Sequence, residues 1–391
     1  MQTTKETLSW MIILQLTAAG LAAAAFPDAR RLPPPGWTGH VFAMSQGYPT
    51  TKPVKTAPWA SINFTTQPEQ YIRAVLAYAI DGNVAVAWDV QNNTVRKWYH
   101  VPWMHPDREF VRGLTVEKTS VARYLHPNQT TPVRNYAVGM YNPLGGYTLG
   151  QVWLGASAPD LTKAKFPVGS VSFKLLFTEA TTNQVPFLKN SLEWQIDTGT
   201  STSATAPVTP TTVRLLQVDL AVRDSRRAGK TGWVFGTFIY DGDAPGATVC
   251  DRLVPVGLMW GNDPTVTPSQ VESGTAQLQQ SWINPVALPT ANPQLMTHLG
   301  WAGRLNGPVD NKNSSCLSCH STAQWMLNPP KMFPPAVPPA TEAMALPWFR
   351  NIKAGKPFSS GAQSLDYSLQ MSVGVRNYQD SLPKANRTGE P

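Results

Sequence analysis

Three segments near the middle of the chain have the dense β-branched and aromatic composition of buried strands. They are SVSFKLLFTEA (170–180), VRLLQVDLAVRD (213–224) and GWVFGTFIYDG (232–242), each bounded by Gly, Asp or Pro. In the first segment, alternation separates one face with Ser172, Lys174 and Leu176 from a second face with Val171, Phe173, Leu175 and Phe177. The pattern therefore predicts a β-rich region from about residue 133.

Helical spacing of apolar residues occurs at both ends of this region. QPEQYIRAVLAYAI (67–80) predicts one helix, and SLDYSLQMSVGVRNYQ (364–379) predicts a C-terminal helix with Leu365, Leu369 and Val373 on one side. NVAVAWDVQNN (83–93) is predicted to be a strand. The chain has 36 prolines, so long helices should be few and many connections extended. The expected fold class is α+β, mainly β, with a few peripheral helices and long Pro-rich loops.

Low-complexity stretches separate these elements. Residues 27–60 and 327–362 are rich in proline and predict irregular structure, and the Ser/Thr/Pro insert at 198–212 predicts a mobile loop. We expect an N-terminal extension (26–132) that packs on the core, a central domain (133–326) and a Pro-rich tail with the C-terminal helix (327–391).

The first 25 residues have the layout of a secretory signal peptide. A lysine precedes an apolar stretch from Leu8, which ends in the small residues Ala22–Ala25 ahead of Phe26. The alternative is an uncleaved membrane anchor, but Gln15 and Thr17 make this a poor span. We therefore expect a periplasmic or otherwise exported protein without a transmembrane span in the mature chain.

The charge pattern excludes one class of partner. Charged residues make up 14% of the chain and the net charge is +8, with Lys and Arg spread out. The sequence has no basic stripe with interleaved aromatic residues, which is the pattern that would predict nucleic-acid binding. The densest basic cluster, RDSRRAGK (223–230), is interpreted as a solvated turn or as a docking patch for an acidic partner protein.

The strongest chemical signal is the run Cys316-Leu317-Ser318-Cys319-His320. Covalent attachment of haem requires two thiols that reach the two vinyl groups and an axial nitrogen for the iron. This run supplies all three, with Cys316 and Cys319 as thioether donors and His320 as the proximal ligand. The sequence therefore predicts one covalently bound haem c.

Zinc and a redox disulfide are the alternatives. A structural zinc site needs a second pair of ligands, and the remaining candidates are Cys250 and an isolated histidine such as His298. A thioredoxin-type Cys pair would accompany a βαβ unit, whereas this one follows the loop GRLNGPVDNKNSS. The odd third cysteine also argues against a disulfide scaffold.

The ligand on the opposite face of the iron would decide the function. Met371 lies 51 residues beyond His320 and is a candidate sixth ligand, or a plain core methionine. Met332 and Met344 are weaker candidates. His100 and His105 are candidate distal groups within an aromatic cluster that forms either a core corner or a pocket wall beside a planar cofactor; the cluster comprises Trp98, Tyr99, His100, Trp103, Met104 and His105.

Several segments before the haem motif together resemble the core of the cytochrome P-460 family. In order, they are YNPLGGYTLGQVW, KFPVGSVSFKLLF, VDLAVRDSRRAGKTGWVFGTFIYDG and CLSCH, read as strands leading to the motif. The matching elements are Phe166-Pro167-Val168-Gly169, Arg223-Asp224, and Thr231-Gly232-Trp233 through Gly236. The resemblance covers about residues 135–325, with insertions at 181–212 and 243–310.

This resemblance implies an antiparallel β-sheet packed on the covalently bound haem, with His320 proximal and no protein ligand on the distal side. Members of the family oxidise hydroxylamine or bind nitric oxide and related gases. The enzymatic branch has a lysine cross-linked to the porphyrin, and Lys174 lies on the matching strand. Lys174 can meet the haem only if its face of the strand is the haem face; otherwise it is an ordinary lysine that reaches solvent.

Three functional hypotheses follow. The first is an exported mono-haem cytochrome that binds or transforms small nitrogen oxides at an open iron face, and the hydroxylamine-oxidising oxidoreductases are its enzymatic form. The second is an electron-transfer cytochrome with Met371 or a histidine as sixth ligand, which docks an acidic redox partner. The third is a subunit of a larger redox complex.

Overall fold

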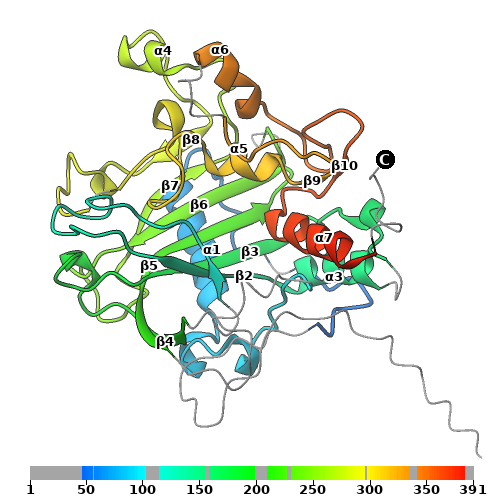
Figure 1. Cartoon of the computed structure of the whole chain (residues 1–391), viewed down its shortest axis with the longest axis horizontal. Helices are drawn as coiled ribbons and strands as arrows, with labels where there is room; N and C mark the ends of the chain where they lie inside the picture. The colour runs from blue at the N-terminus through cyan, green and yellow to red at the C-terminus, as the bar shows by residue number, and fades with distance from the viewer. Residues whose placement is uncertain are drawn as a thin grey trace, which may run out of the picture.

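An antiparallel sheet of eight strands forms the centre of the molecule (Figure 1). The computed structural model describes residues 46–55, 57–102, 114–154, 158–198, 209–226, 230–295, 297–334 and 341–383. The strand order is β1-β2-β3-β5-β6-β7-β8, with β4 also paired to β5, and every pairing is antiparallel. The mainly β, antiparallel α+β fold expected from the sequence is therefore confirmed.

The strands are mostly short, and β5 is the longest. Their bounds are β1 (Thr115–Val116), β2 (Asn135–Tyr141), β3 (Val171–Thr178), β4 (Glu193–Asp197), β5 (Pro210–Arg223), β6 (Trp233–Tyr240), β7 (Leu253–Met259) and β8 (Ser281–Ile283). A separate two-stranded ladder pairs β9 (Gln324–Trp325) with β10 (Gln363–Ser364). The strands predicted at 170–180, 213–224 and 232–242 correspond to β3, β5 and β6.

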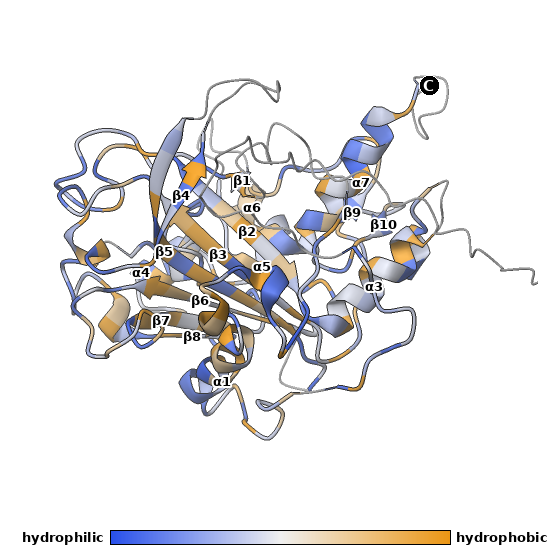
Figure 2. Ribbon diagram, turned by 90° about the horizontal axis from the view of Figure 1, so that it is seen from below, coloured by the Kyte–Doolittle hydropathy of each residue, from blue (hydrophilic) through white to orange (hydrophobic). Residues whose placement is uncertain are grey.

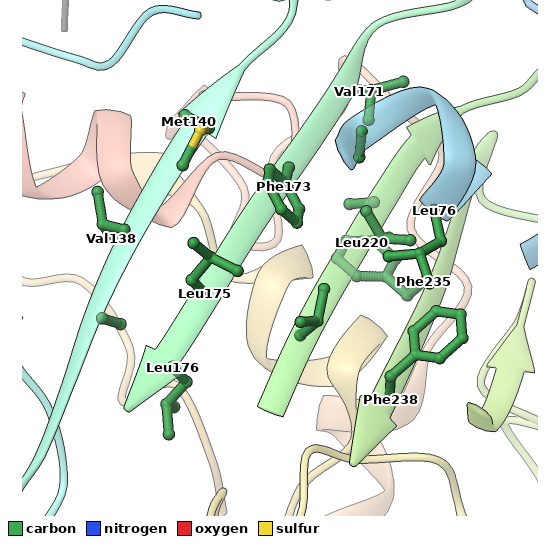
Figure 3. Close-up of a cluster of buried hydrophobic side chains, with 14 of the residues drawn as sticks. Leu76, Val138, Met140, Val171, Phe173, Leu175, Leu176, Leu220, Phe235 and Phe238 are labelled. Carbon is green, nitrogen blue, oxygen red and sulfur yellow. The ribbon is translucent and has the colours of Figure 1, made fainter. Parts of the chain in front are cut away.

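One face of the sheet is apolar and is covered by the N-terminal region. The helix α1 (Pro68–Ile80), confirmed as predicted, packs its Ile72 against Gly236, where an added Cβ would lie 2.3 Å from the Ile72 Cδ1 atom. Figure 3 shows Leu76 of α1 near Leu220 of β5. The Phe173 ring on the same face contacts two tryptophans that follow α1, Trp88 and Trp98. Hydrophobic residues dominate β3 and β6 in Figure 2.

The opposite face is polar at its centre. Five residues that are paired in register form one row across the central strands. From β2 to β7 they are Gly139, Lys174, Asp219, Thr237 and Gly257. The helices α3 (Pro143–Trp153), α5 (Cys316–Ser321) and α7 (Leu369–Ser381) lie on this side, whereas α1 lies behind the sheet (Figure 1). The short helices α4 (Pro268–Glu272) and α6 (Glu342–Ala345) lie at the periphery.

Two local predictions are wrong. Residues 83–93 form two 3-10 turns, Val84–Val86 and Val90–Asn92, instead of a strand. The Asn93 side chain donates to Asp81 O and to Asn83 Oδ1, and these hydrogen bonds close the segment into a loop. Ala87 and Trp88 have positive φ angles of 51° and 68°, and this turn buries the Trp88 ring.

The segment YNPLGGYTLGQVW is also not a strand beyond its first residue. Tyr141 ends β2, and Pro143–Trp153 form α3. The Asn142 side chain caps the helix by accepting from Gly145 N, and Pro143 occupies the first turn. Gly146 allows Tyr99 to approach, since an added Cβ would lie 2.4 Å from its ring.

The C-terminal helix is confirmed, although it begins later than predicted. It starts at Leu369 with Ser368 as its N-cap, and its buried positions are Met371, Gly374, Val375 and Tyr378. The signal-peptide region, most of the insert at 198–212 and His105 lie outside the described residues. Among the described helices, none is long and apolar enough to cross a membrane.

Candidate cofactor site

The predicted haem motif forms a short helix that presents its chemistry on one face. Ser315 caps α5 by accepting from Ser318 N, and the Ser318 hydroxyl accepts from Ser315 N in return. Leu317 and Ser318 are buried. The three motif residues Cys316, Cys319 and His320 are partly exposed and share the opposite side, as i, i+3 and i+4 positions do.

The His320 ring is held in one tautomer. Its Nδ1 atom lies 2.9 Å from the carbonyl oxygen of Tyr367, and its ring centroid lies 4.7 Å from that of Phe235. Because a carbonyl only accepts, Nδ1 carries the hydrogen and Nε2 keeps its lone pair. Burial lowers the pKa of His320 to about 4, so the imidazole is neutral at pH 7. His320 therefore has the protonation state of a metal ligand that binds through Nε2.

The carbonyl that orients His320 belongs to a turn on which two of the segments quoted from the sequence converge. The Asp366 carboxylate accepts hydrogen bonds from Phe166 N at 2.8 Å and from Trp233 Nε1 at 3.1 Å. The Phe166 and Trp233 rings are in edge contact at 5.7 Å. The Arg223 guanidinium donates to Gly232 O at 2.6 Å, which links the Arg223-Asp224 segment to the segment that contains Trp233. Segments far apart in sequence thus meet behind the histidine.

Lys174 lies on the face of the sheet that is turned toward α5. Its ammonium Nζ lies 3.6 Å from Asp219 Oδ2, and the two side chains keep 28% and 24% of their surface exposed. The Asp219 carboxylate also accepts from Thr237 Oγ1 at 2.6 Å and from Gln217 Nε2 at 2.8 Å. Both side chains are therefore partly accessible on this face.

The electrostatics of this row and of the motif are linked. Burial raises the pKa of Asp219, the positive charge of Lys174 opposes the shift and Asp310 reinforces it. Burial likewise raises the pKa of Cys316 well above its usual value, with added effects of Asp219 and Asp310. It raises the pKa of Cys319 to about 12, against the opposing Lys174 charge. Both thiols are therefore protonated at neutral pH.

Several of these residues were missed from the sequence. Asp219 carried a usable signal, because a carboxylate inside the apolar strand VDLAV is rare unless it has partners. Asp310 and Asp366 lie in loops without a recognisable pattern. Only the tertiary fold brings these two residues close to the motif.

Among the described residues, the candidate sixth ligands do not gather around the motif. Met371 is fully buried in α7, which begins just after Tyr367 and so lies on the Nδ1 side of His320. This position favours a core role over ligation. Met332 and Met344 are 47% and 55% exposed in the tail. His100 is buried, and its carbonyl accepts from Tyr48 Oη.

The zinc and disulfide alternatives find no support. All three cysteines are unpaired. Cys250 lies beside α1, which covers the other face of the sheet, and His298 packs on Tyr124, with Nε2 2.7 Å from its carbonyl. Within the described residues, no group of three His, Cys, Asp or Glu side chains is arranged to hold a metal ion.

The donor set fits a covalently attached haem. Two unpaired thiols and a neutral imidazole with its Nε2 lone pair share one helical face, next to the sheet face that carries Lys174 and Asp219. Comparisons with protein-family models, with curated proteins and with solved structures find no match.

Proposed function

We propose that the chain is an exported, mono-haem c-type cytochrome of the P-460 kind. Cys316 and Cys319 would form the thioethers, and His320 would ligate the iron through Nε2. The observation that carries the proposal is the hydrogen bond from His320 Nδ1 to Tyr367 O. It commits one ring nitrogen to the protein and leaves the other for a metal, as the hydrogen-bond acceptors beside metal-bound histidines do.

The proposed substrate class is small nitrogen oxides and related molecules, bound at an open iron face. The bound haem would supply a coordination position and a redox couple. Lys174, Asp219 and Thr237 would supply the polar groups of the neighbouring sheet face, which suit a small polar ligand better than a hydrophobic one. A hydroxylamine-oxidising activity with Lys174 cross-linked to the porphyrin is the enzymatic form of this proposal.

Covalent attachment is the first test. The full chain is coexpressed with a haem c maturation system, and the denatured protein is assayed for bound haem by its pyridine haemochrome spectrum and mass. We expect one haem, which is lost in the double variant Cys316→Ala/Cys319→Ala and kept in Cys250→Ala, the matched single-thiol control. A wild-type protein without covalent haem would sink the proposal. Periplasmic fractionation of the same cells tests export.

The second test separates ligand binding from electron transfer. We expect the reduced protein to be high-spin and to take up CO and NO. A low-spin spectrum that is indifferent to CO and becomes high-spin in Met371→Leu would instead establish the electron-transfer alternative, in which Met371 is the sixth ligand. A red-shifted ferrous Soret band that disappears in Lys174→Arg would demonstrate the lysine cross-link.

A further inference from the structure

The Asp366 side chain is a fully engaged carboxylate next to the residue that orients His320. Asp366 is 2% exposed. Its Oδ1 atom accepts from Trp233 Nε1 at 3.1 Å and from Gly355 N at 3.0 Å, and its Oδ2 atom accepts from Phe166 N at 2.8 Å. Three donors from three chain segments therefore converge on one side chain.

The backbone at this position is strained. Asp366 and Tyr367 have consecutive positive φ angles of 47° and 69°, although neither is glycine. Such a backbone conformation is unfavourable for a non-glycine residue and persists only where its surroundings hold it. The Asp366 hydrogen bonds hold the first residue, and the Tyr367 hydroxyl, which donates to Ile352 O, holds the second.

The strained turn fixes the direction of one carbonyl. Tyr367 O lies 2.9 Å from His320 Nδ1, so a rotation of the peptide would lengthen or break this hydrogen bond. Acceptance of the Nδ1 hydrogen sets the tautomer and makes the opposite nitrogen a stronger donor to a metal. The Trp233 and Phe235 rings flank the Tyr367 ring at centroid distances of 6.3 and 6.2 Å and leave little room for an alternative turn.

We propose that Asp366 is a positioning residue that sets the tautomer, orientation and donor strength of His320 through the carbonyl of Tyr367. The iron-based readouts below rest on the proposed haem function, whereas the readout on the apoprotein does not.

The main variant is Asp366→Asn, which preserves shape but replaces one acceptor oxygen with an NH2 group that faces an N–H donor. Trp233→Phe is the milder second variant, because it removes one donor and keeps an aromatic ring in place. Asp241→Asn is the matched control. Asp241 is a buried carboxylate at the far end of β6 that accepts from Asp243 N and Asn292 Nδ2, and neither group bonds to His320.

In the apoprotein, the 15N chemical shifts of His320 report its tautomer. We expect the wild type and Asp241→Asn to show a protonated Nδ1 only, and Asp366→Asn to show a mixture of tautomers. In the haem-loaded protein, we expect Asp366→Asn to shift the iron–histidine stretching frequency downward and the reduction potential upward, and Trp233→Phe to do so by less.

Unchanged tautomer, frequency and potential in both variants, with a loss of stability equal to that of Asp241→Asn, would overturn the inference and leave Asp366 a purely structural residue. Absence of haem from the wild type would defeat the proposed function instead. The 15N spectrum of the apoprotein would then still decide the role of Asp366.

Discussion

At the scale of single residues, the site combines a motif that is visible in the sequence with partners that are not. Cys316, Cys319 and His320 are adjacent in the chain, so their spacing alone predicts their chemistry. Alternation along β3 limits Lys174 to one of two faces, and only the structure identifies which. Asp366 could not be predicted, because its role depends on contacts with residues 200 and 133 positions away.

Asp219 gives a prediction about pH. Burial raises its pKa, so the folded state favours the protonated acid more than the unfolded chain does. This contribution to stability is present below the ordinary pKa and is lost as the pH rises through the raised value. We therefore expect the free energy of unfolding of the wild-type apoprotein, relative to Asp219→Asn, to fall as the pH increases from about 3 to 7.

The measurement is urea unfolding at a series of pH values within this range. The difference between the wild type and a variant is compared, because other carboxylates contribute the same background to both proteins. The same series for Asp241→Asn provides the control. A wild-type advantage over Asp219→Asn that grows with pH would contradict the assigned direction of the shift.

At the scale of elements, the predictions succeeded where a segment's own pattern decides its structure. The strands β3, β5 and β6 and the helix α1 follow their periodicity. The segment 83–93 and α3 were missed because side-chain hydrogen bonds of Asn93 and Asn142 outweigh the β propensity of their neighbours. Within the basic cluster at 223–230, Arg226 is only a third exposed and donates to Asp224, so this arginine does not lie on a fully solvated turn.

The Arg226–Asp224 pair joins the end of β5 to the N-terminal region. Arg226 donates to both Asp224 oxygens and to the carbonyl of Ile62, and Tyr71 of α1 donates to Asp224 Oδ2 at 3.1 Å. Burial of Asp224 opposes ionisation, but the Arg226 hydrogen bonds and charge outweigh it and lower the pKa of Asp224. The stability from this pair is therefore present above the ordinary pKa and lost as the pH falls.

We expect Arg226→Ala to reduce the free energy of unfolding by about 2 kcal/mol, less than the ~3–5 kcal/mol of a fully buried pair because Arg226 keeps a third of its surface exposed. Arg73→Ala is the control, since its pair with Glu69 on α1 is about half exposed and should contribute about 0.3–0.5 kcal/mol. Equal losses in both variants, measured by urea unfolding at pH 7, would show that the Arg226 pair has no special role.

At the scale of the whole molecule, the sheet has the hydrophobic core on one side and the candidate site on the other. Its apolar face is part of one hydrophobic core that includes Trp59, Phe64 and Tyr71 from the N-terminal region. The opposite face carries Lys174, Asp219 and the motif helix. The N-terminal region therefore contributes to the interior of the molecule, and it also touches the loop beside the candidate site, where the Tyr124 hydroxyl donates to Asp310 O at 2.9 Å.

Two central glycines test this separation. Gly236 lies under α1, where an added Cβ would lie 2.3 Å from Ile72, whereas at Gly139 on the other face the nearest atom is the Gln370 amide nitrogen at 3.4 Å. We expect Gly236→Ala to destabilise the protein by about 1–3 kcal/mol and Gly139→Ala by less. Hydrogen exchange should show faster opening of α1 in Gly236→Ala only.

Replacing Ile72 by Val should restore part of the stability of Gly236→Ala, because it removes the Cδ1 atom that the new methyl group meets. No coupling between the two substitutions in a double-mutant cycle would contradict close packing of α1 on β6.

The separation of 47 positions between His320 and its carbonyl partner Tyr367 also sets an order of events during synthesis. A ribosome releases the two cysteines and the histidine before it has made the turn at 366–367 and the helix that follows it. Until then the imidazole lacks the carbonyl that accepts its Nδ1 hydrogen, and the Phe235 ring alone does not select a tautomer. We therefore expect chains truncated before Asp366 to accept covalent modification at the cysteines yet to leave the histidine unlocked. The turn at 366–367 would thus fix the imidazole only after the two cysteines have become accessible.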